Sequence, residues 1–184
     1  MKRRLEQFGI ASGLFDEIDI KKKGTSDSDP FQIYVKILNY TANMIDVGYG
    51  VSQILPLLTE VLLADSKKPA IYLMQQPEVH LHPRAQAEFG SLMQRIFAGS
   101  NSYCIAETHS DYIVDRVRNH ISQGEIKKED VSVIFLDRGD HDSSVYQIEL
   151  DDNGNLVETP PNYRQFFKRE TLRSLGVSDD VLDS

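Results

Sequence analysis

The first part of the chain shows a pattern of apolar and polar positions that predicts a helix followed by a β-hairpin. Residues 1–9 read as the end of a helix that closes near Gly9. Residues 18–23 and 31–38 are strand-like, and the second of these segments alternates apolar and polar positions as a half-buried strand does. The polar segment 24–30 lies between them, so the two strands are predicted to pair as an antiparallel hairpin.

Beyond residue 50 the pattern changes to strands and helices in turn. Residues 51–64 are densely apolar and predict a buried helix, whose true start Pro56 is expected to mark. After it the pattern predicts strands and helices in the order strand 70–74, helix 83–97, strand 102–106, a helix capped by Ser110, and strand 131–136. Such alternation at this spacing implies a parallel sheet covered by helices.

The remainder of the chain is predicted to add an antiparallel strand and a tail. Residues 144–150 follow a turn and are expected to pair with strand 131–136, and residues 163–175 predict a short helix before an acidic end. The fold class is therefore α/β, with a mainly parallel sheet flanked by helices and an N-terminal antiparallel hairpin. We predict one domain over residues 1–160 and a helical tail over residues 161–184.

Composition narrows the classes of protein. The 184 residues are enough for a domain with a core, and the net charge of −8 argues against a broad basic surface for nucleic acid. The single cysteine, Cys104, excludes an internal disulfide framework. No apolar stretch reaches the roughly 20 residues that span a bilayer. These features predict a cytoplasmic protein with no membrane association.

Three polar clusters carry the candidate chemistry. Two of them follow predicted parallel strands, where ligands of open sheets bind: Gln75-Gln76-Pro77-Glu78 and Glu107-Thr108-His109-Ser110. The third cluster is the glycine-rich segment 46–53, which leads into a helix and could present free backbone amides to an anion.

In this order and spacing the clusters resemble the C-terminal half of an ABC-type ATPase domain. The resemblance covers residues 1–150 and is to the RecF, SMC and overcoming-lysogenization-defect group of ATPases. Within that group it is closest to the AAA-like ATPases of prokaryotic anti-phage defence operons, including Septu-type systems. It implies ATP and Mg²⁺ as cofactors, a homodimer, and an association with a nuclease effector.

The resemblance also implies a role for each matching position. Residues 47–53 match the signature motif, so the γ-phosphate of a nucleotide held by a second subunit would contact Gly48, Gly50, Ser52 and Gln53. Gln75 matches the Walker B position, and Gln76 matches the carboxylate that polarises the attacking water. His82 falls in the D-loop that crosses the dimer, and His109 matches the switch histidine that touches the γ-phosphate.

Two departures from the family pattern change the picture. No G-x-x-x-x-G-K-[ST] loop is present, so the phosphate-binding loop is expected from the N-terminal half of the same ATPase or from another polypeptide. Gln75 and Gln76 are amides, which cannot accept a proton and hold a hard cation weakly. Glu78 and Glu107 are nearby carboxylates that could stand in, although for Glu78 a helix-dipole partner role before Pro83 is favoured. We expect the isolated chain neither to bind ATP tightly nor to hydrolyse it.

Other interpretations remain open at this point. His80, His82 and His109 could form a metal triad, although a turn carries the first two and no metal site is predicted. The acidic cluster Asp137, Asp140 and Asp142 could belong to a metal-dependent nuclease, although a hairpin turn explains it as well. The chain could also be a non-catalytic interaction module whose apolar faces dock a nuclease or another effector.

Overall fold

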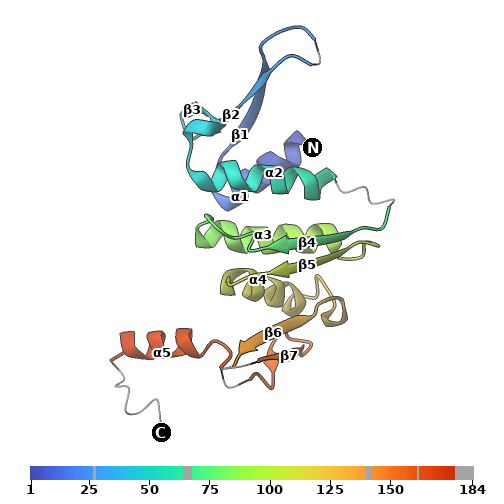
Figure 1. The fold of residues 1–184 in the computed structure, drawn as a ribbon, viewed down its shortest axis with the longest axis vertical. Coiled ribbons are helices and arrows are strands. Elements are labelled where there is room, and N and C mark those ends of the chain that lie inside the picture. Colours follow the sequence, from blue (N-terminus) through green and yellow to red (C-terminus); the bar gives the residue numbers. More distant parts are fainter. Residues whose placement is uncertain (27, 64–67, 140–141, 161, 177–184) are drawn as a thin grey trace. The chain divides into compact units, whose positions relative to one another are not determined.

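The structure is a computed structural model that describes residues 1–26, 28–63, 68–139, 142–160 and 162–176. The chain divides into two compact units, Met1–Ile126 and Lys127–Ser184, whose helices and strands are labelled in Figure 1. None of the helices in the described ranges is long and apolar enough to cross a membrane.

The first helix, α1 (Lys2–Ser12), is longer than its sequence indicates. It continues past Gly9, where the prediction closed it, and ends at Gly13, which adopts a left-handed φ of 76°. Gly9 lies inside the helix for a packing reason, because a Cβ atom there would lie 2.4 Å from the ring of Phe15. The predicted end at Gly9 was therefore wrong: this glycine permits a close contact and does not end the helix.

An antiparallel sheet follows α1 and confirms the predicted hairpin. It contains β1 (Glu17–Lys22), β2 (Phe31–Ile37) and β3 (Tyr40–Asn43) in that order, and the register places Ile18 opposite Val35. The third strand was not predicted. It forms because Leu38 takes a left-handed φ of 55°, which allows the chain to turn back directly after β2.

A 3-10 turn, Met44–Asp46, leads into α2 (Tyr49–Leu63), the central helix of the first unit. The helix begins at Tyr49, so the prediction that Pro56 marks its start was wrong. Apolar residues on both sides of Pro56, including Val51 and Leu58, are buried in the core. Burial of this continuous face offsets the backbone hydrogen bond that a proline removes from a helix.

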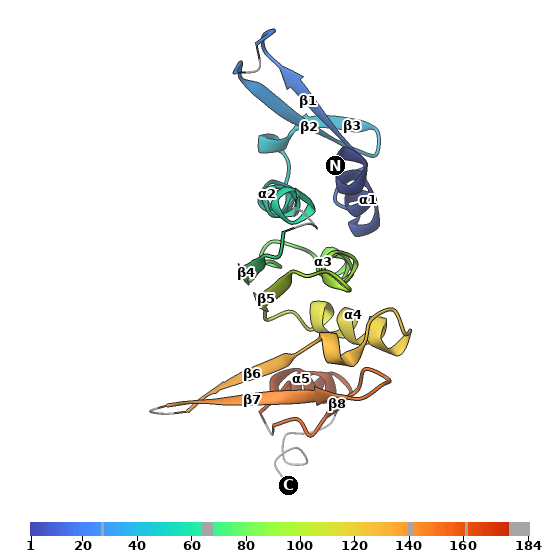
Figure 2. The same cartoon turned by 90° about the vertical axis from the view of Figure 1, so that its right-hand side faces the viewer.

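The parallel sheet of the first unit consists of β4 (Ile71–Gln75) and β5 (Tyr103–Glu107). Helices α3 (Pro83–Phe97) and α4 (Asp111–Ser122) follow these strands, and Figure 2 shows both helices on the same side of the sheet. Pro83 is the first residue of α3, where its fixed φ and missing N–H suit a helix start. The predicted α/β fold, with a parallel sheet, covering helices and an N-terminal antiparallel sheet, is confirmed.

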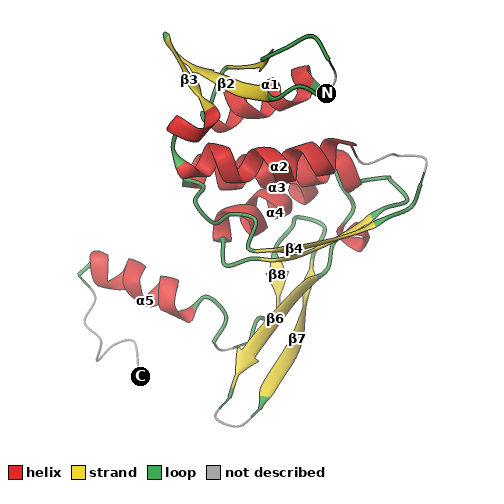
Figure 3. Cartoon of the chain, turned by 45° about the horizontal axis from the view of Figure 1, so that its top comes forward, coloured by secondary structure: helices red, strands yellow, loops and turns green. Residues whose placement is uncertain are grey.

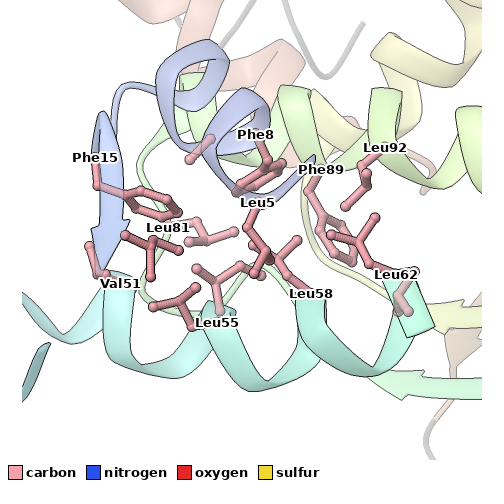
Figure 4. Close-up of a cluster of buried hydrophobic side chains, with 14 of the residues drawn as sticks. Leu5, Phe8, Phe15, Val51, Leu55, Leu58, Leu62, Leu81, Phe89 and Leu92 are labelled. Carbon is pink, nitrogen blue, oxygen red and sulfur yellow. The ribbon is translucent and has the colours of Figure 1, made fainter. Parts of the chain in front are cut away.

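The core of the first unit lies between α1, α2 and α3. Figure 4 shows Phe8 from α1, Leu58 from α2 and Phe89 from α3 meeting in it, and all three side chains are buried. Leu81, from the turn before α3, belongs to the same cluster. This core therefore anchors the start of α2 and the turn after β4, the two segments that carry the candidate site.

The second unit is built on an antiparallel sheet of β6 (Val133–Arg138), β7 (Ser143–Leu150) and β8 (Leu156–Val157), followed by α5 (Gln165–Ser174) (Figure 3). A short 3-10 turn, Lys128–Asp130, precedes β6. The antiparallel pairing of β6 with β7 is as predicted. The expected membership of strand 131–136 in the parallel sheet stays a prediction. The acidic end of the tail lies outside the described residues.

Candidate functional site

The turn between β4 and α3 carries Gln76, one of the two candidate catalytic residues, in an unusual backbone conformation. Gln75 ends β4 and pairs in register with Glu107 at the end of β5. Gln76 follows with a left-handed φ of 44°, and its backbone N–H donates a 2.8 Å hydrogen bond to the carbonyl oxygen of Glu107. His80, later in the turn, also has a left-handed φ, of 72°. The turn is thus tied to the neighbouring strand while two of its side-chain-bearing residues stay in a region that favours glycine.

Glu78 is the buried acid of this turn, with only 7% of its surface exposed. Its Oε1 accepts a 2.7 Å hydrogen bond from the backbone N–H of His109, which lies in the loop after β5. Its Oε2 is buried and has no hydrogen-bond partner. The side chain therefore joins the β4–α3 turn to the β5–α4 loop, and a role as dipole partner of the helix at Pro83 stays a prediction.

Gln86, at the end of the first turn of α3, makes a second link between the same two segments. Its Nε2 donates a 2.7 Å hydrogen bond to the carbonyl oxygen of Leu81, and its Oε1 accepts a 2.6 Å bond from Ser110 Oγ. Ser110 Oγ also accepts a 3.2 Å bond from the N–H of Ile113, which confirms Ser110 as the N-cap of α4. The first turns of α3 and α4 are thus held together by Gln86 and Ser110, each of which makes two side-chain hydrogen bonds.

The start of α2 lies against the same turn. A Cβ atom on Gly50 would lie 2.6 Å from the carbonyl oxygen of His80, so only a glycine fits there without a shift of the backbone. The ring of Tyr49 meets the ring of His80 edge-on, with 4.8 Å between the ring centroids. The glycine-rich cluster and the β4–α3 turn, which lie about thirty residues apart in the sequence, are therefore in direct contact.

A pocket of about 320 Å³ lies where these segments converge. Residues from the β4–α3 turn, α3 and the start of α4 line it: Gln76, Glu78, Val79, His80, Leu81, Gln86, His109 and Ser110. Gln76 and His109, the two residues expected to be catalytic, therefore face one pocket. Its remaining polar lining includes one buried carboxylate, one amide and one further imidazole, which can bind and orient a polar ligand.

The other expected site residues lie outside the lining of this pocket. Gly48 and Gln53 are exposed near the start of α2, and the Ser52 hydroxyl donates a 3.0 Å hydrogen bond to the carbonyl oxygen of Tyr49. Gln75 is exposed at the end of β4. His82 is the N-cap of α3, where its Nδ1 accepts from the N–H of Ala85 at 3.4 Å.

Two contacts of the site could not be found by sequence reasoning. Gln86 is a polar residue in a helix with an apolar face, and nothing in its spacing distinguishes it from a solvated glutamine. His80 was considered only as a metal ligand, whereas its carbonyl oxygen and ring both contact the start of α2.

The described residues provide no cluster of ligands suited to a metal ion. No group of three His, Cys, Asp or Glu side chains that could hold one occurs in the described ranges. Mg²⁺ prefers carboxylate oxygens, and Gln75 provides a neutral amide at the position where the resemblance implies a metal ligand. These residues do not fit a Mg²⁺ site built by this chain alone. In the acidic cluster of the second unit, Asp137 accepts a 2.8 Å bond from Asn162, and Asp140 lies outside the described residues.

Cys104 lies in β5 and is half-buried. Burial raises the pKa of its thiol from 9.0 to about 11, so the thiol stays protonated at neutral pH. A protonated thiol is a poor nucleophile, which places Cys104 in the packing of the sheet and outside the candidate chemistry.

Comparison with solved structures shows that the chain has the fold of an SMC-type ATPase head. It is similar to a structure from a study of ATP-driven dimerization and DNA stimulated activation of SMC ATPases, with a TM-score of 0.54, 13% identity, and coverage of 79% of this chain and 81% of that one. It is also similar to an SmcHead bound to the C-winged helix domain of ScpA, with a TM-score of 0.60, 16% identity, and coverage of 82% and 42%.

A third similar structure is the Smc head domain with an extended coiled coil bound to the C-terminal domain of ScpA, from Pyrococcus furiosus. It has a TM-score of 0.59, 12% identity, and coverage of 80% of this chain and 34% of that one. The chain thus spans less than half the length of two of these heads. Similarity at such low identity establishes the fold alone.

The sequence identifies the family. A profile of the AAA ATPase domain matches residues 8–114, more than half of the 184 residues, and the chain belongs to this family. The matched segment contains all three polar clusters. No curated protein matches the sequence. The resemblance to AAA-like and SMC-type ATPases is confirmed.

Proposed function

We propose that this chain supplies the signature, Walker B/D-loop and switch-histidine regions of an ABC-type ATPase that binds and hydrolyses ATP. The observation that carries the proposal is the convergence of Gln76 and His109 on one pocket in a chain of the AAA ATPase family. The pocket lies where the parallel strands β4 and β5 end, the place where open sheets bind their ligands.

The start of α2 supports a phosphate-binding role for the glycine-rich cluster. Free backbone amides at a helix start favour an anion, and the space around Gly48 is open, because a Cβ there would meet no atom within 4 Å. In this proposal a nucleotide held by a second subunit places its γ-phosphate near Gly48, Gly50, Ser52 and Gln53. Two such domains close head to tail as a homodimer, and His82 lies in the segment that crosses between them.

The phosphate-binding loop comes from a segment outside these 184 residues, in our proposal the N-terminal half of the same ATPase. The exposed face of β4 and β5 supports this arrangement. It carries Ile71, Leu73, Tyr103 and Ile105, which are 62–76% exposed. Parallel sheets are normally covered on both faces, so a second layer belongs here. Gln75 lies on the same face at the end where the loop would bring the phosphates.

Catalysis in this proposal rests on positioning. Gln76 orients a water in line with the γ-phosphate, and His109 donates a hydrogen bond to the phosphate as its charge develops. Mg²⁺, when bound with ATP, would neutralise phosphate charge, and no residue described here is assigned to hold it.

The proposed biological role rests on the resemblance alone. We propose that the ATPase acts in a DNA-related or anti-phage defence system, where it drives a nuclease effector. The domain over residues 1–160 with a tail over residues 161–184 also stays a prediction.

The test compares the chain alone with the chain co-expressed with a polypeptide that carries G-x-x-x-x-G-K-[ST]. Binding of a fluorescent ATP analogue is measured for both preparations. We expect binding only by the co-expressed pair. Hydrolysis by the purified chain alone would refute the need for a second segment, and absence of binding by both preparations would refute the proposed function.

A matched pair of variants locates the contact between the two polypeptides. Leu73→Glu places a charge on the exposed face of β4 and β5, and should abolish complex formation and with it ATP binding. Leu38→Glu, in the turn before β3, changes an equally exposed leucine of the N-terminal sheet and should have no effect. Equal behaviour of the two variants would place the contact elsewhere.

The exposed apolar face also fits a second candidate function, a non-catalytic module that docks a nuclease or another effector. In that case Leu73→Glu would abolish binding of the effector, while the co-expressed pair would bind no ATP. Measuring nucleotide binding and complex formation on the same samples separates the two functions.

A further inference from the structure

Glu78 has a structural setting that the proposed function does not use. It is the only acid among the described residues that line the pocket, and it is more than nine-tenths buried. One of its oxygens holds the backbone N–H of His109 at 2.7 Å, which fixes the loop of the expected switch histidine. The other oxygen, Oε2, has no hydrogen-bond partner. A buried carboxylate oxygen without a donor is unfavourable, so its presence points to a ligand that completes it.

The two positions at which the resemblance implies acids, 75 and 76, carry no group that can accept a proton from water. Gln75 and Gln76 are amides, and an amide oxygen accepts hydrogen bonds but does not accept a proton at neutral pH. The other titratable groups in the pocket lining are the imidazoles of His80 and His109. Among the described residues, Glu78 is therefore the one acid that lines the pocket together with Gln76.

We infer that Glu78 is the carboxylate of the hydrolytic site and takes the task that the amides at positions 75 and 76 cannot perform. This inference rests on the proposed function. Gln76 orients the attacking water, and Oε2 of Glu78 accepts a hydrogen bond from it. The bond to His109 holds the same carboxylate against the segment that would contact the γ-phosphate, so one side chain couples the water to the switch loop.

The chemical step balances without a further reactant. One O–H bond of the water breaks and its proton passes to Oε2, while the water oxygen forms a bond to the γ-phosphorus of ATP. The bond between the γ-phosphorus and the bridging oxygen breaks, and its electron pair leaves with ADP. The proton on Glu78 is then returned to the released phosphate. Oε2 is shielded from solvent in this structure, so entry of the water requires a movement of side chains in the pocket wall.

Glu78→Gln separates the two tasks of the side chain. Its amide oxygen can still accept from the His109 N–H, whereas the proton acceptor is lost. The experiment uses the chain co-expressed with the polypeptide that carries the phosphate-binding loop, and measures ATP binding and single-turnover hydrolysis on the same samples. Glu60→Gln, on the exposed side of α2, is the matched control, and thermal unfolding verifies that each variant is folded.

We expect Glu78→Gln to bind ATP as the parent does and to hydrolyse it about a hundredfold more slowly, the usual effect of losing a general base. Glu60→Gln should behave as the parent. Parental hydrolysis by Glu78→Gln, or a loss of hydrolysis in Glu107→Gln alone, would overturn the assignment and leave the proposed function intact. Absence of ATP binding by the parent pair would overturn the proposed function and this inference with it.

Discussion

The contact between Gly50 and the carbonyl oxygen of His80 determines whether Gly50→Ala raises or lowers the free energy of unfolding. Gly50 is the second residue of α2, where alanine is intrinsically the better helix former by up to about 1 kcal/mol. A substitution without steric conflict would therefore stabilise the unit or leave it unchanged. In this structure the added Cβ would lie 2.6 Å from the His80 oxygen, whereas ordinary contacts begin at 3.4 Å. The two segments must separate by about 0.8 Å, the difference between these distances.

Gly50→Ala is therefore expected to destabilise the chain. Overpacking of this kind costs about 1–3 kcal/mol, and the helix preference of alanine offsets part of it, which leaves a net loss of about 1–2 kcal/mol. For a unit of this size each kcal/mol lowers the midpoint of thermal unfolding by roughly 2–8 °C. Circular dichroism melts and urea titrations of the variant and the parent measure the difference.

Gly48→Ala is the matched control. A Cβ there would meet nothing within 4 Å, so any cost comes only from the weaker N-cap preference of alanine, about 1 kcal/mol or less. If Gly50→Ala proved as stable as the parent, or more stable than Gly48→Ala, the start of α2 would not pack on the β4–α3 turn as described. The expected order of stability is parent, Gly48→Ala and then Gly50→Ala.

Three further predictions concern the stability and reactivity of the first unit. Ser110→Ala removes the cap of α4 and the bond to Gln86, and should lower the free energy of unfolding by about 1–2 kcal/mol in urea titrations, while Ser122→Ala at the helix end should change little. Arg84→Lys should cost about 0.5–1.5 kcal/mol in the same assay, because Arg84 donates to two carbonyl oxygens at the end of α1 through nitrogens that lysine lacks; an unchanged stability would show that these bonds contribute nothing. Alkylation of Cys104 should be slow in the native chain below the raised pKa of its thiol, about 11. The stability that this pKa shift contributes is fully present below pH 9 and should be lost as pH rises toward 11. Fast alkylation of the native chain at pH 8 would contradict the burial of the thiol.

The elements that sequence reasoning placed best are those set by local chemistry. Residues 83–97 were predicted as a helix with the bounds that α3 has, because a proline at the start and apolar residues at helical spacing are both local signals. The prediction from Pro56 failed for the opposite reason: a proline is a local signal of a helix start, but burial of the residues on both sides of Pro56 decides where α2 begins. The antiparallel pairing of β6 with β7 was also predicted, because these two strands are adjacent in the sequence.

The site shows the same division. Gln76 and His109 could be brought to one pocket from sequence because both follow parallel strands, and the ends of such strands meet at one edge of a sheet. Glu78 was named as a candidate carboxylate, but its buried position and its bond to the His109 N–H depend on side-chain packing across two loops. The same holds for the contact of Gly50 with His80, in which a glycine is required by a carbonyl oxygen from a distant segment.

The left-handed conformations of Gln76 and His80 have a consequence for protein engineering. Each residue occupies a backbone region that costs a side-chain-bearing residue about 1 kcal/mol or more, and glycine would relieve that cost. A search for thermostable variants of this chain should therefore select Gln76→Gly and His80→Gly readily. Such variants would gain stability by deleting the side chains that line the pocket, so a screen for heat resistance alone would select against any activity located there.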